Sequence, residues 1–273
     1  IQNIISNCSD KLLEVRNRRE QPGKDDKVIT SWNGLMISAF LSGYRITDDS
    51  KYLDLAKKSI DFFESNFEKN HILHRTFKNG EPKLNGYLDD YAYMAKASID
   101  MFENTSEPKY LLFATNLANY LITHFWDDSS NGFFFTANNH EKLIIRPKNN
   151  YDLSMPSGNS VAAHVLLTLY HITQNKEFLE ITKKLIESQA VSAAENPFAF
   201  GYLLNVFYLY YQKPTEITII NDKNFELIST LRKKFLPESI MILVKNEKDL
   251  TSLSEHSFFS GKEFQQNKTN VFV

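Results

Sequence analysis

The sequence predicts a mainly α-helical protein, an array of antiparallel helical hairpins followed by a small α/β appendage. Three observations support this fold class. A short sequence motif, expected at the C-terminal end of a helix, recurs three times along the chain. Each recurrence is followed by a second amphipathic stretch with apolar residues at helical spacing. From Pro214 onward the pattern changes to strand, helix, strand.

The repeated motif places its helices in pairs. It ends in a threonine each time, and an aromatic residue follows five positions later, in the pairs Thr47 and Tyr52, Thr105 and Tyr110, Thr173 and Phe178. We expect the first helices over 31–46, 88–105 and 157–173, and the second over 51–67, 108–124 and 176–188. The first set is rich in small and apolar residues, which predicts an inner layer, whereas the charged face of the second set predicts an outer one.

The remaining segments complete the expected order of elements. A seventh helix over 198–211 has no outer partner in the sequence. Short strands are expected between hairpins at 71–76, 132–136 and 143–146. A strand at 216–220, a helix at 225–235 and a strand at 239–244 follow, and the last 25 residues show little pattern. We therefore divide the chain into a partial toroid of hairpins, 1–213, and an α/β appendage with a polar tail, 214–273.

Composition excludes several classes of function. Thirty-one basic and thirty-three acidic residues give a net charge of -2 without a basic stripe, so nucleic acid is not an expected partner. No apolar run approaches the roughly 20 residues that span a bilayer, so no membrane partner is expected. The single cysteine, Cys8, fits a cytoplasmic protein. Nucleotide and zinc motifs are missing, so we predict no cofactor and no metal. The chain starts at Ile1, which suggests a piece of a longer protein.

Polar residues gather at the predicted N-terminal ends of the inner helices. Positions fourteen residues before the repeated threonines are Asn33, Tyr91 and Asn159, so their surroundings are equivalent. The simplest interpretation is helix capping, because Ser31, Asp89 and Ser157 are good N-cap residues. They lie next to one another in the predicted array, so we expect one polar face there.

Some features exceed what capping requires. Asp90 follows Asp89, and two adjacent carboxyls invite the unequal pKa values that acid and base catalysts use. Arg146 offers a donor fork for a carboxylate, and Trp32 offers a flat apolar face. The structural alternatives stay open. Arg146 can tie two loops together, and Trp32 can belong to the core. The charged triplet that precedes Trp32, Asp25-Asp26-Lys27, can be a solvated turn. His74, on a rim strand, is a weaker candidate.

Three segments resemble a known family: DDKVITSWNGLM at 25–36, LDDYAYM at 88–94 and PSGNSVAA at 156–163. Together they are similar to the spermatogenesis-associated, thioredoxin-domain-containing protein family, over most of residues 14–215. The resemblance implies a thioredoxin-like domain followed by an (α/α)6 toroid, similar to six-hairpin glycosidases and N-acylglucosamine epimerases, and a small α/β region. This chain resembles the later portion, so the thioredoxin-like domain would be its partner in a longer parent.

The resemblance carries over thirteen motif positions as a candidate site. They are Asp25, Asp26, Lys27, Trp32, Asn33, Asp89, Asp90, Tyr91, Arg146, Asp152, Ser157, Gly158 and Asn159. The resemblance indicates which residues form the site, but it does not indicate the reaction or the role of each residue.

Two functions compete for these residues. The first is a ligand-binding or scaffold module with a polar pocket at the inner-helix N-termini, in which Arg146 is held by Asp152 or Asp26. The alternative is a carbohydrate-active enzyme, a glycoside hydrolase or epimerase, with Asp89, Asp90 or Asp26 as acid and base and the other motif residues binding a sugar. If Asp89 and Asp90 both lie in helix caps or ion pairs, the enzyme hypothesis fails. A third hypothesis is that a half-toroid is inactive alone.

Overall fold

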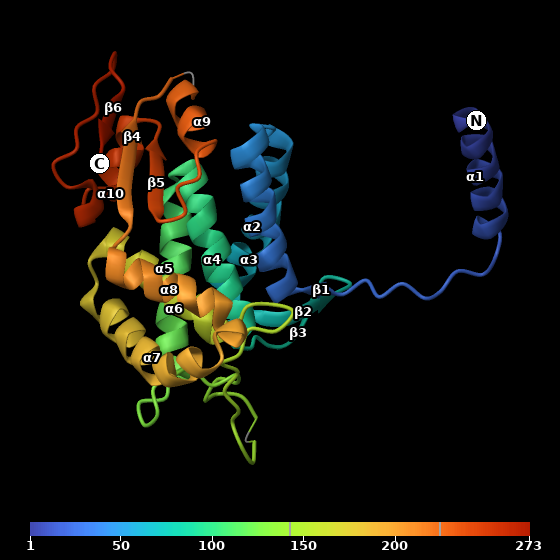
Figure 1. Cartoon of the computed structure of the whole chain (residues 1–273), viewed down its shortest axis with the longest axis horizontal. Coiled ribbons are helices and arrows are strands. Elements are labelled where there is room, and N and C mark those ends of the chain that lie inside the picture. Colours follow the sequence, from blue (N-terminus) through green and yellow to red (C-terminus); the bar gives the residue numbers. More distant parts are fainter. Residues whose placement is uncertain (142, 224) are drawn as a thin grey trace.

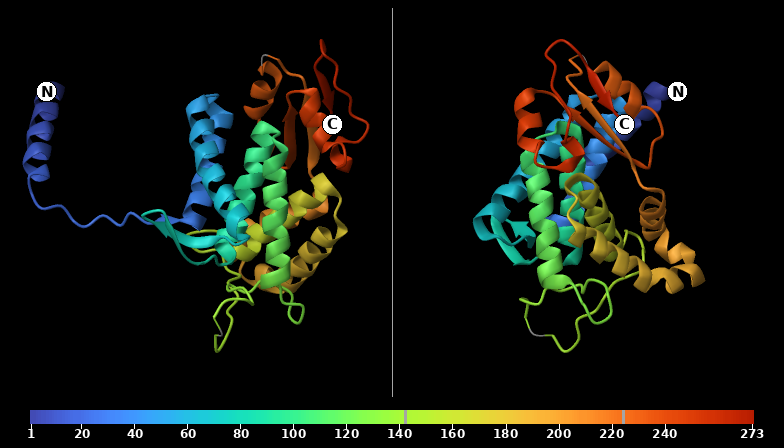
Figure 2. Two further views of the ribbon diagram at one scale, coloured as in Figure 1. Left: turned by 180° about the vertical axis from the view of Figure 1, so that it is seen from behind. Right: turned by 90° about the vertical axis from the view of Figure 1, so that its left-hand side faces the viewer.

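The computed structural model describes residues 1–141, 143–223 and 225–273, and within them the helices form hairpins in two layers (Figure 1). The inner layer contains α2 (Thr30–Thr47), α4 (Leu88–Thr105) and α6 (Gly158–Thr173). The outer layer contains α3 (Ser50–Asn70), α5 (Pro108–Phe125) and α7 (Lys176–Glu195). In the view from behind, α5 lies nearest the viewer (Figure 2, left). The predicted pairs are confirmed, with outer helices that run further than expected.

The repeated threonine has a structural role in each hairpin turn. The hydroxyl of Thr47 donates to the carbonyl of Gly43 and accepts from the backbone N–H of Asp49. Thr105 and Thr173 make the same pair of bonds. The residue after each threonine is left-handed, with φ of 57° at Asp48, 55° at Ser106 and 59° at Gln174. One side chain therefore closes the inner helix and fixes the turn that starts the outer one.

The inner helices pack closely because they carry small residues. Five alanines of α4 and α6 are fully buried: Ala92, Ala95, Ala97, Ala162 and Ala163. A Cβ atom at Gly34 of α2 would lie 2.8 Å from the backbone carbon of Tyr93 in α4, so only glycine permits this approach. The predicted seventh helix is a short 3₁₀ turn, η1 (Pro197–Phe200), followed by α8 (Gly201–Gln212), which packs on α6.

The connections between hairpins differ partly from the prediction. Strands β1 (Val28–Ile29), β2 (His74–Lys78) and β3 (Glu81–Asn85) form an antiparallel sheet in that order. The expected strand at 71–76 thus lies a few residues later, and β3 was not predicted. The strands expected at 132–136 and 143–146 are wrong. Phe133 makes an isolated bridge to Trp126. Ile144 and Ile145 are exposed, and in the described part of the chain neither belongs to a strand.

The α/β unit lies on the C-terminal ends of the inner helices (Figures 1 and 2). Strands β4 (Thr215–Ile220) and β5 (Ser239–Val244) pair in parallel, with α9 (Glu226–Arg232) between them in the chain. The supposedly patternless tail forms α10 (Glu247–Leu253), the turn η2 (Ser257–Phe259) and β6 (Asn270–Phe272), which pairs antiparallel with β4. Because β5 contacts α4 and α9 contacts α2, the opposite, N-terminal ends of the inner helices stay uncovered by this unit.

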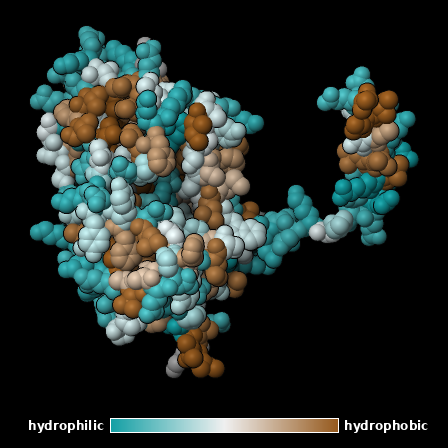
Figure 3. Space-filling view, viewed as in Figure 1, coloured by the Kyte–Doolittle hydropathy of each residue, from teal (hydrophilic) through white to brown (hydrophobic). Residues whose placement is uncertain are grey.

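An N-terminal helix, α1 (Gln2–Asn17), lies apart from the rest of the protein, and none of its residues is buried. Its exposed apolar residues are visible in Figure 3. Among the described residues, none of the helices is long and apolar enough to cross a membrane.

Candidate functional site

Asp90 is the structural centre of the polar end. It is fully buried in the first turn of α4, where one oxygen accepts the backbone N–H of Tyr87 at 2.9 Å. The other accepts the backbone N–H of Ser31 and Nη1 of Arg75, each at 2.9 Å. Burial raises the pKa of Asp90, whereas Arg75 and the two backbone groups lower it. All three partners are donors, so the carboxylate ties together α2, β2 and α4.

Asp89 has different surroundings. It lines a cavity of about 310 Å³ with Tyr93, Lys148, Tyr151 and neighbouring residues of the connection to α6. Burial, followed by the charge of Asp90, raises the pKa of Asp89 to about 6, from an ordinary 3.8. The backbone N–H of Gly158 bonds to Asp89 and opposes this shift. Asp89 is thus a carboxyl that faces a cavity and changes its charge near neutral pH.

The wall beside Asp89 depends on a glycine. A Cβ atom at Gly158 would lie 2.4 Å from Oδ1 of Asp89 and 2.7 Å from Cγ of Leu88. The hydroxyl of Tyr93, one helical turn after Asp89, donates to the carbonyl of Pro156. Burial raises the pKa of Tyr93, so the phenol keeps its proton. The start of α6 is therefore held directly against the start of α4.

Asp152 and Asn159 brace the loop that closes the cavity. Asp152 accepts the backbone N–H groups of Ser157 and Tyr202, both at 2.7 Å, which uses both carboxylate oxygens. The side chain of buried Asn159 bonds to the backbone N–H and carbonyl of Phe133 and to the carbonyl of Asn149. These two predicted site residues hold loops in place.

The charged triplet of the sequence motif lies outside the cavity. Asp25 pairs with Lys27 at 3.2 Å and Asp26 with Lys78 at 2.9 Å, all on the surface. These cations lower the pKa of both carboxyls. Trp32 is 59% exposed on α2 and so is no core residue. Like Asn33, whose amide caps the carbonyl of Ile29, it is absent from the lining of the Asp89 cavity.

Arg146 does not bind the carboxylate that was expected for it. Its guanidinium donates to the carbonyls of Thr136 and His124 and lies over the ring of Phe134, with Cζ 4.1 Å from the centroid. The prediction that Asp152 or Asp26 holds it is wrong, because Asp152 already holds two backbone N–H groups and Asp26 pairs with Lys78. Arg146 joins two loops through their backbones instead.

Tyr91 and His74 lie outside the cavity that contains Asp89. Tyr91 is fully buried and its hydroxyl accepts the backbone N–H of Leu73 at 2.9 Å. The ring of His74 lies near Phe77, and burial lowers its pKa. Neither residue lines the cavity that contains Asp89.

Two of the three capping predictions are wrong by two residues. The N-cap positions are Ile29 for α2 and Tyr87 for α4, which places Ser31 and Asp89 inside the first turn. For α6 the prediction is confirmed, because Oγ of Ser157 accepts the backbone N–H of Ser160 at 3.0 Å. The Asp89 side chain is left free of the cap because Asp90, at the third helical position, satisfies the N–H of Tyr87.

Sequence reasoning missed Arg75, Tyr93 and Tyr151 as contributors to this region. Tyr93 had a usable signal, since its position four residues after Asp89 places both on one helix face. Arg75 and Tyr151 reach the region only through β2 and an irregular loop, which no periodicity predicts. In the described part of the chain, no group of three His, Cys, Asp or Glu side chains is arranged to hold a metal ion.

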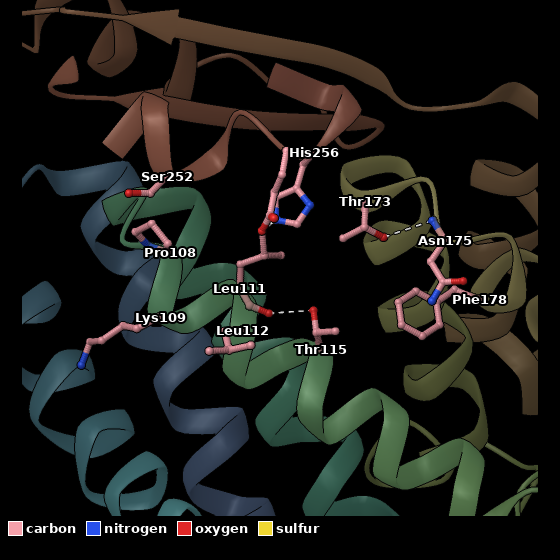
Figure 4. A pocket seen from close by; sticks show the side chains of 11 residues that line it. Pro108, Lys109, Leu111, Leu112, Thr115, Thr173, Asn175, Phe178, Ser252 and His256 are labelled. Atoms are coloured by element: carbon pink, nitrogen blue, oxygen red, sulfur yellow. Dashed lines mark hydrogen bonds and ion pairs between the residues drawn. The ribbon is translucent and has the colours of Figure 1, made fainter. Parts of the chain in front are cut away.

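A larger cavity, of about 550 Å³, lies near the opposite end of the helices (Figure 4). Leu111, Leu112 and Thr115 of α5 face Phe178 of α7 across it, and His256 approaches from the α/β unit. Lys109 at its edge pairs with Asp61 and Glu64 of α3. This groove is distant from the polar ends of α4 and α6, so it is separate from the Asp89 cavity.

Comparison with known proteins places the chain in a family. The model of glycosyl hydrolase family 76 matches residues 2–187, which include the whole polar end. The chain belongs to glycosyl hydrolase family 76. One curated relative is human spermatogenesis-associated protein 20, which is 23% identical over all of this chain and 37% of the human protein. Another is an uncharacterised Caenorhabditis elegans protein, which is 26% identical over 91% of this chain and 35% of the worm protein. The chain thus spans about a third of the length of these relatives, and the resemblance found in the sequence motifs is confirmed.

Solved structures of family 76 share the fold. An α-mannanase of the family from Bacteroides thetaiotaomicron aligns with a TM-score of 0.54 and 15% identity, covering 78% of this chain and 58% of the other. A family 76 hydrolase from a bovine strain of the same species aligns with a TM-score of 0.50 and 21% identity, covering 62% of this chain and 36% of the other. The hairpins therefore form part of an (α/α) toroid, as predicted.

Proposed function

We propose that this chain binds an α-linked mannose oligosaccharide in the cavity lined by Asp89, at the N-terminal ends of α4 and α6. The observation that carries the proposal is the contrast between the two adjacent carboxyls. Both oxygens of Asp90 already accept hydrogen bonds, from three donors in all. Asp89 faces the cavity and has one backbone partner. A free carboxyl can accept hydrogen bonds from sugar hydroxyls, and membership of family 76 supports a sugar as the ligand.

Other residues around Asp89 suit a neutral, hydroxyl-rich ligand. Among the described residues, Lys148 is the cation that lines this cavity, and its ammonium is paired with Asp127 at 2.7 Å, so its charge is already compensated. Asn149 and Ser154 add uncharged polar groups, and Tyr151 and Leu153 add exposed apolar surface. In a longer parent, we propose that this module works beside the thioredoxin-like domain that the sequence resemblance implies.

The proposal is tested by isothermal titration calorimetry with α-linked mannobiose and mannotriose. Wild type should bind the oligosaccharides, and Asp89→Asn should weaken binding about tenfold, because a charged acceptor is replaced by a neutral amide. Asp25→Asn is the matched control, since Asp25 is exposed and lies outside the cavity. Absence of binding by wild type, or equal loss in both variants, would overturn the proposal.

Glycoside hydrolysis is the second candidate, and the raised pKa of Asp89 favours it. A carboxyl with a pKa of about 6 is suited to donate a proton to a leaving group near neutral pH. Hydrolysis also needs a second carboxylate across the sugar, and Asp89 is the one carboxyl among the described residues that line this cavity. Binding therefore has priority over catalysis for this chain.

Release of reducing sugar from α-linked mannotriose distinguishes the two candidates. Hydrolysis by wild type that is abolished in Asp89→Asn, with mannotriose still bound, would establish catalysis. Binding without turnover in wild type would leave this chain as a sugar-binding module.

A further inference from the structure

We infer that Tyr151 provides the apolar platform on which a sugar ring stacks at the Asp89 cavity. This inference rests on the proposed function and specifies how the same cavity selects a pyranose ring. Tyr151 lines the cavity, and 56% of its surface is exposed. An aromatic ring that is this exposed beside a half-buried carboxyl leaves its apolar surface available to a ligand.

The ring of Tyr151 is held in place from behind. Its centroid lies 5.3 Å from that of Phe200, at an interplanar angle of 61°, and Phe200 is fully buried at the start of α8. This edge-to-face contact helps to orient the ring, and more than half of the Tyr151 surface stays exposed. A preorganised ring loses less conformational freedom on binding than a mobile surface side chain.

The backbone around Tyr151 is fixed as well. The carboxylate of the next residue, Asp152, accepts the N–H groups of Ser157 and Tyr202, and its own N–H donates to the carbonyl of Ala199. These bonds tie the loop to both α6 and η1. Tyr151 therefore keeps its position relative to Asp89, which is set by the start of α4.

Tyr151 and Asp89 together present complementary chemistry. The C–H face of a pyranose ring packs on an aromatic plane, and its hydroxyl edge then requires polar partners such as a carboxylate. Trp32, the aromatic that the sequence pattern singled out, lines no part of this cavity. The structure thus assigns the stacking role to a loop tyrosine.

The experiment compares binding of α-linked mannotriose by Tyr151→Ala, Tyr151→Phe and Tyr211→Ala in calorimetric titrations. Tyr211 is the matched control, because it is 71% exposed on α8 and absent from the cavity lining. We expect Tyr151→Ala to weaken binding about tenfold, Tyr151→Phe to stay within about twofold, and Tyr211→Ala to bind like wild type. Thermal melting of each variant confirms that the fold is intact.

The outcomes separate this inference from the proposed function. If Asp89→Asn weakens binding and Tyr151→Ala does not, the platform is overturned and the sugar site stands. Equal weakening by Tyr151→Ala and Tyr151→Phe would overturn stacking, because the phenyl ring is retained in the second variant. Failure of wild type to bind would overturn both.

Discussion

Asp89 and Asp90 are adjacent in the sequence and opposite in their surroundings. Asp90 is buried among donors, and Asp89 faces a cavity with a pKa raised to about 6. The sequence pattern predicted unequal pKa values for this pair, and the structure accounts for the difference. The N-cap position of α4 decides which of the two carboxyls is used by the cap. The sequence pattern placed this position at Asp89, two residues too late, so it did not show that Asp90 would make the capping bond.

The raised pKa of Asp89 makes the stability of the protein depend on pH. The folded state holds the proton up to about pH 6, whereas the unfolded state releases it near 3.8. The free energy of unfolding therefore decreases by up to about 3 kcal/mol as pH rises from about 4 to above 6. Asp89→Asn removes this loss, so its free energy of unfolding should exceed that of wild type at pH 8 and approach it at pH 4.5.

Chemical denaturation of both proteins at the two pH values measures this difference. A difference between variant and wild type that is the same at pH 8 and pH 4.5 would contradict the assigned pKa of Asp89.

Asp90 should dominate stability rather than binding. Asp90→Ala leaves the backbone N–H groups of Ser31 and Tyr87 without their acceptor and Arg75 without its counter-ion. Loss of one partner of a buried pair costs about 3 kcal/mol or more. Urea denaturation near neutral pH measures it against Asp89→Ala, which breaks no ion pair. A cost below about 1 kcal/mol would be inconsistent with the bonding described for Asp90.

At the scale of elements, the hairpins were predictable because one residue performs one local task in each. The threonines at 47, 105 and 173 bond within their own turn, so their effect needs no tertiary information. The strands expected at 132–136 and 143–146 failed because a strand requires a partner. The apolar composition of these segments does not reveal whether one is present.

Substitution of Gly158 tests the contact between the starts of α4 and α6, and substitution of Gly201 is the control. Gly158→Ala places a methyl group against Asp89 and Leu88, so it should destabilise the protein by about 1–3 kcal/mol and disturb sugar binding. A Cβ atom at Gly201, in the first turn of α8, meets nothing within 4 Å, so Gly201→Ala should be neutral or slightly stabilising. Thermal melting of the two variants side by side provides the comparison. Equal melting temperatures would contradict the close packing at Gly158.

At the scale of the whole molecule, one core joins the toroid helices and the α/β unit. Ile240, Leu253 and Phe259 belong to the same buried cluster as the residues of α4 and α6. This packing covers part of the inner layer and opposes the hypothesis that a partial toroid lacks support. The order β4, α9, β5 was predictable from alternating patterns. The position of the unit was not, because it depends on shape-matching between distant segments.

The separation of α1 gives a prediction for the intact fold. None of its residues is buried, so removal of residues 1–20 should change the melting temperature by no more than about 1–2 °C. Differential scanning calorimetry of the full and shortened chains measures this. A large decrease would show that α1 packs on the toroid in solution.

The most direct test of the account is carbon-13 NMR titration of the aspartate carboxyl groups with and without α-linked mannotriose. We predict that the Asp89 signal, assigned with Asp89→Asn, titrates near pH 6 and shifts when the sugar saturates the protein. The signals of the surface carboxyls Asp25 and Asp26 should stay unchanged. An Asp89 signal that titrates near pH 4, or that saturating sugar leaves unaltered, would contradict the claim that Asp89 lines a sugar-binding cavity.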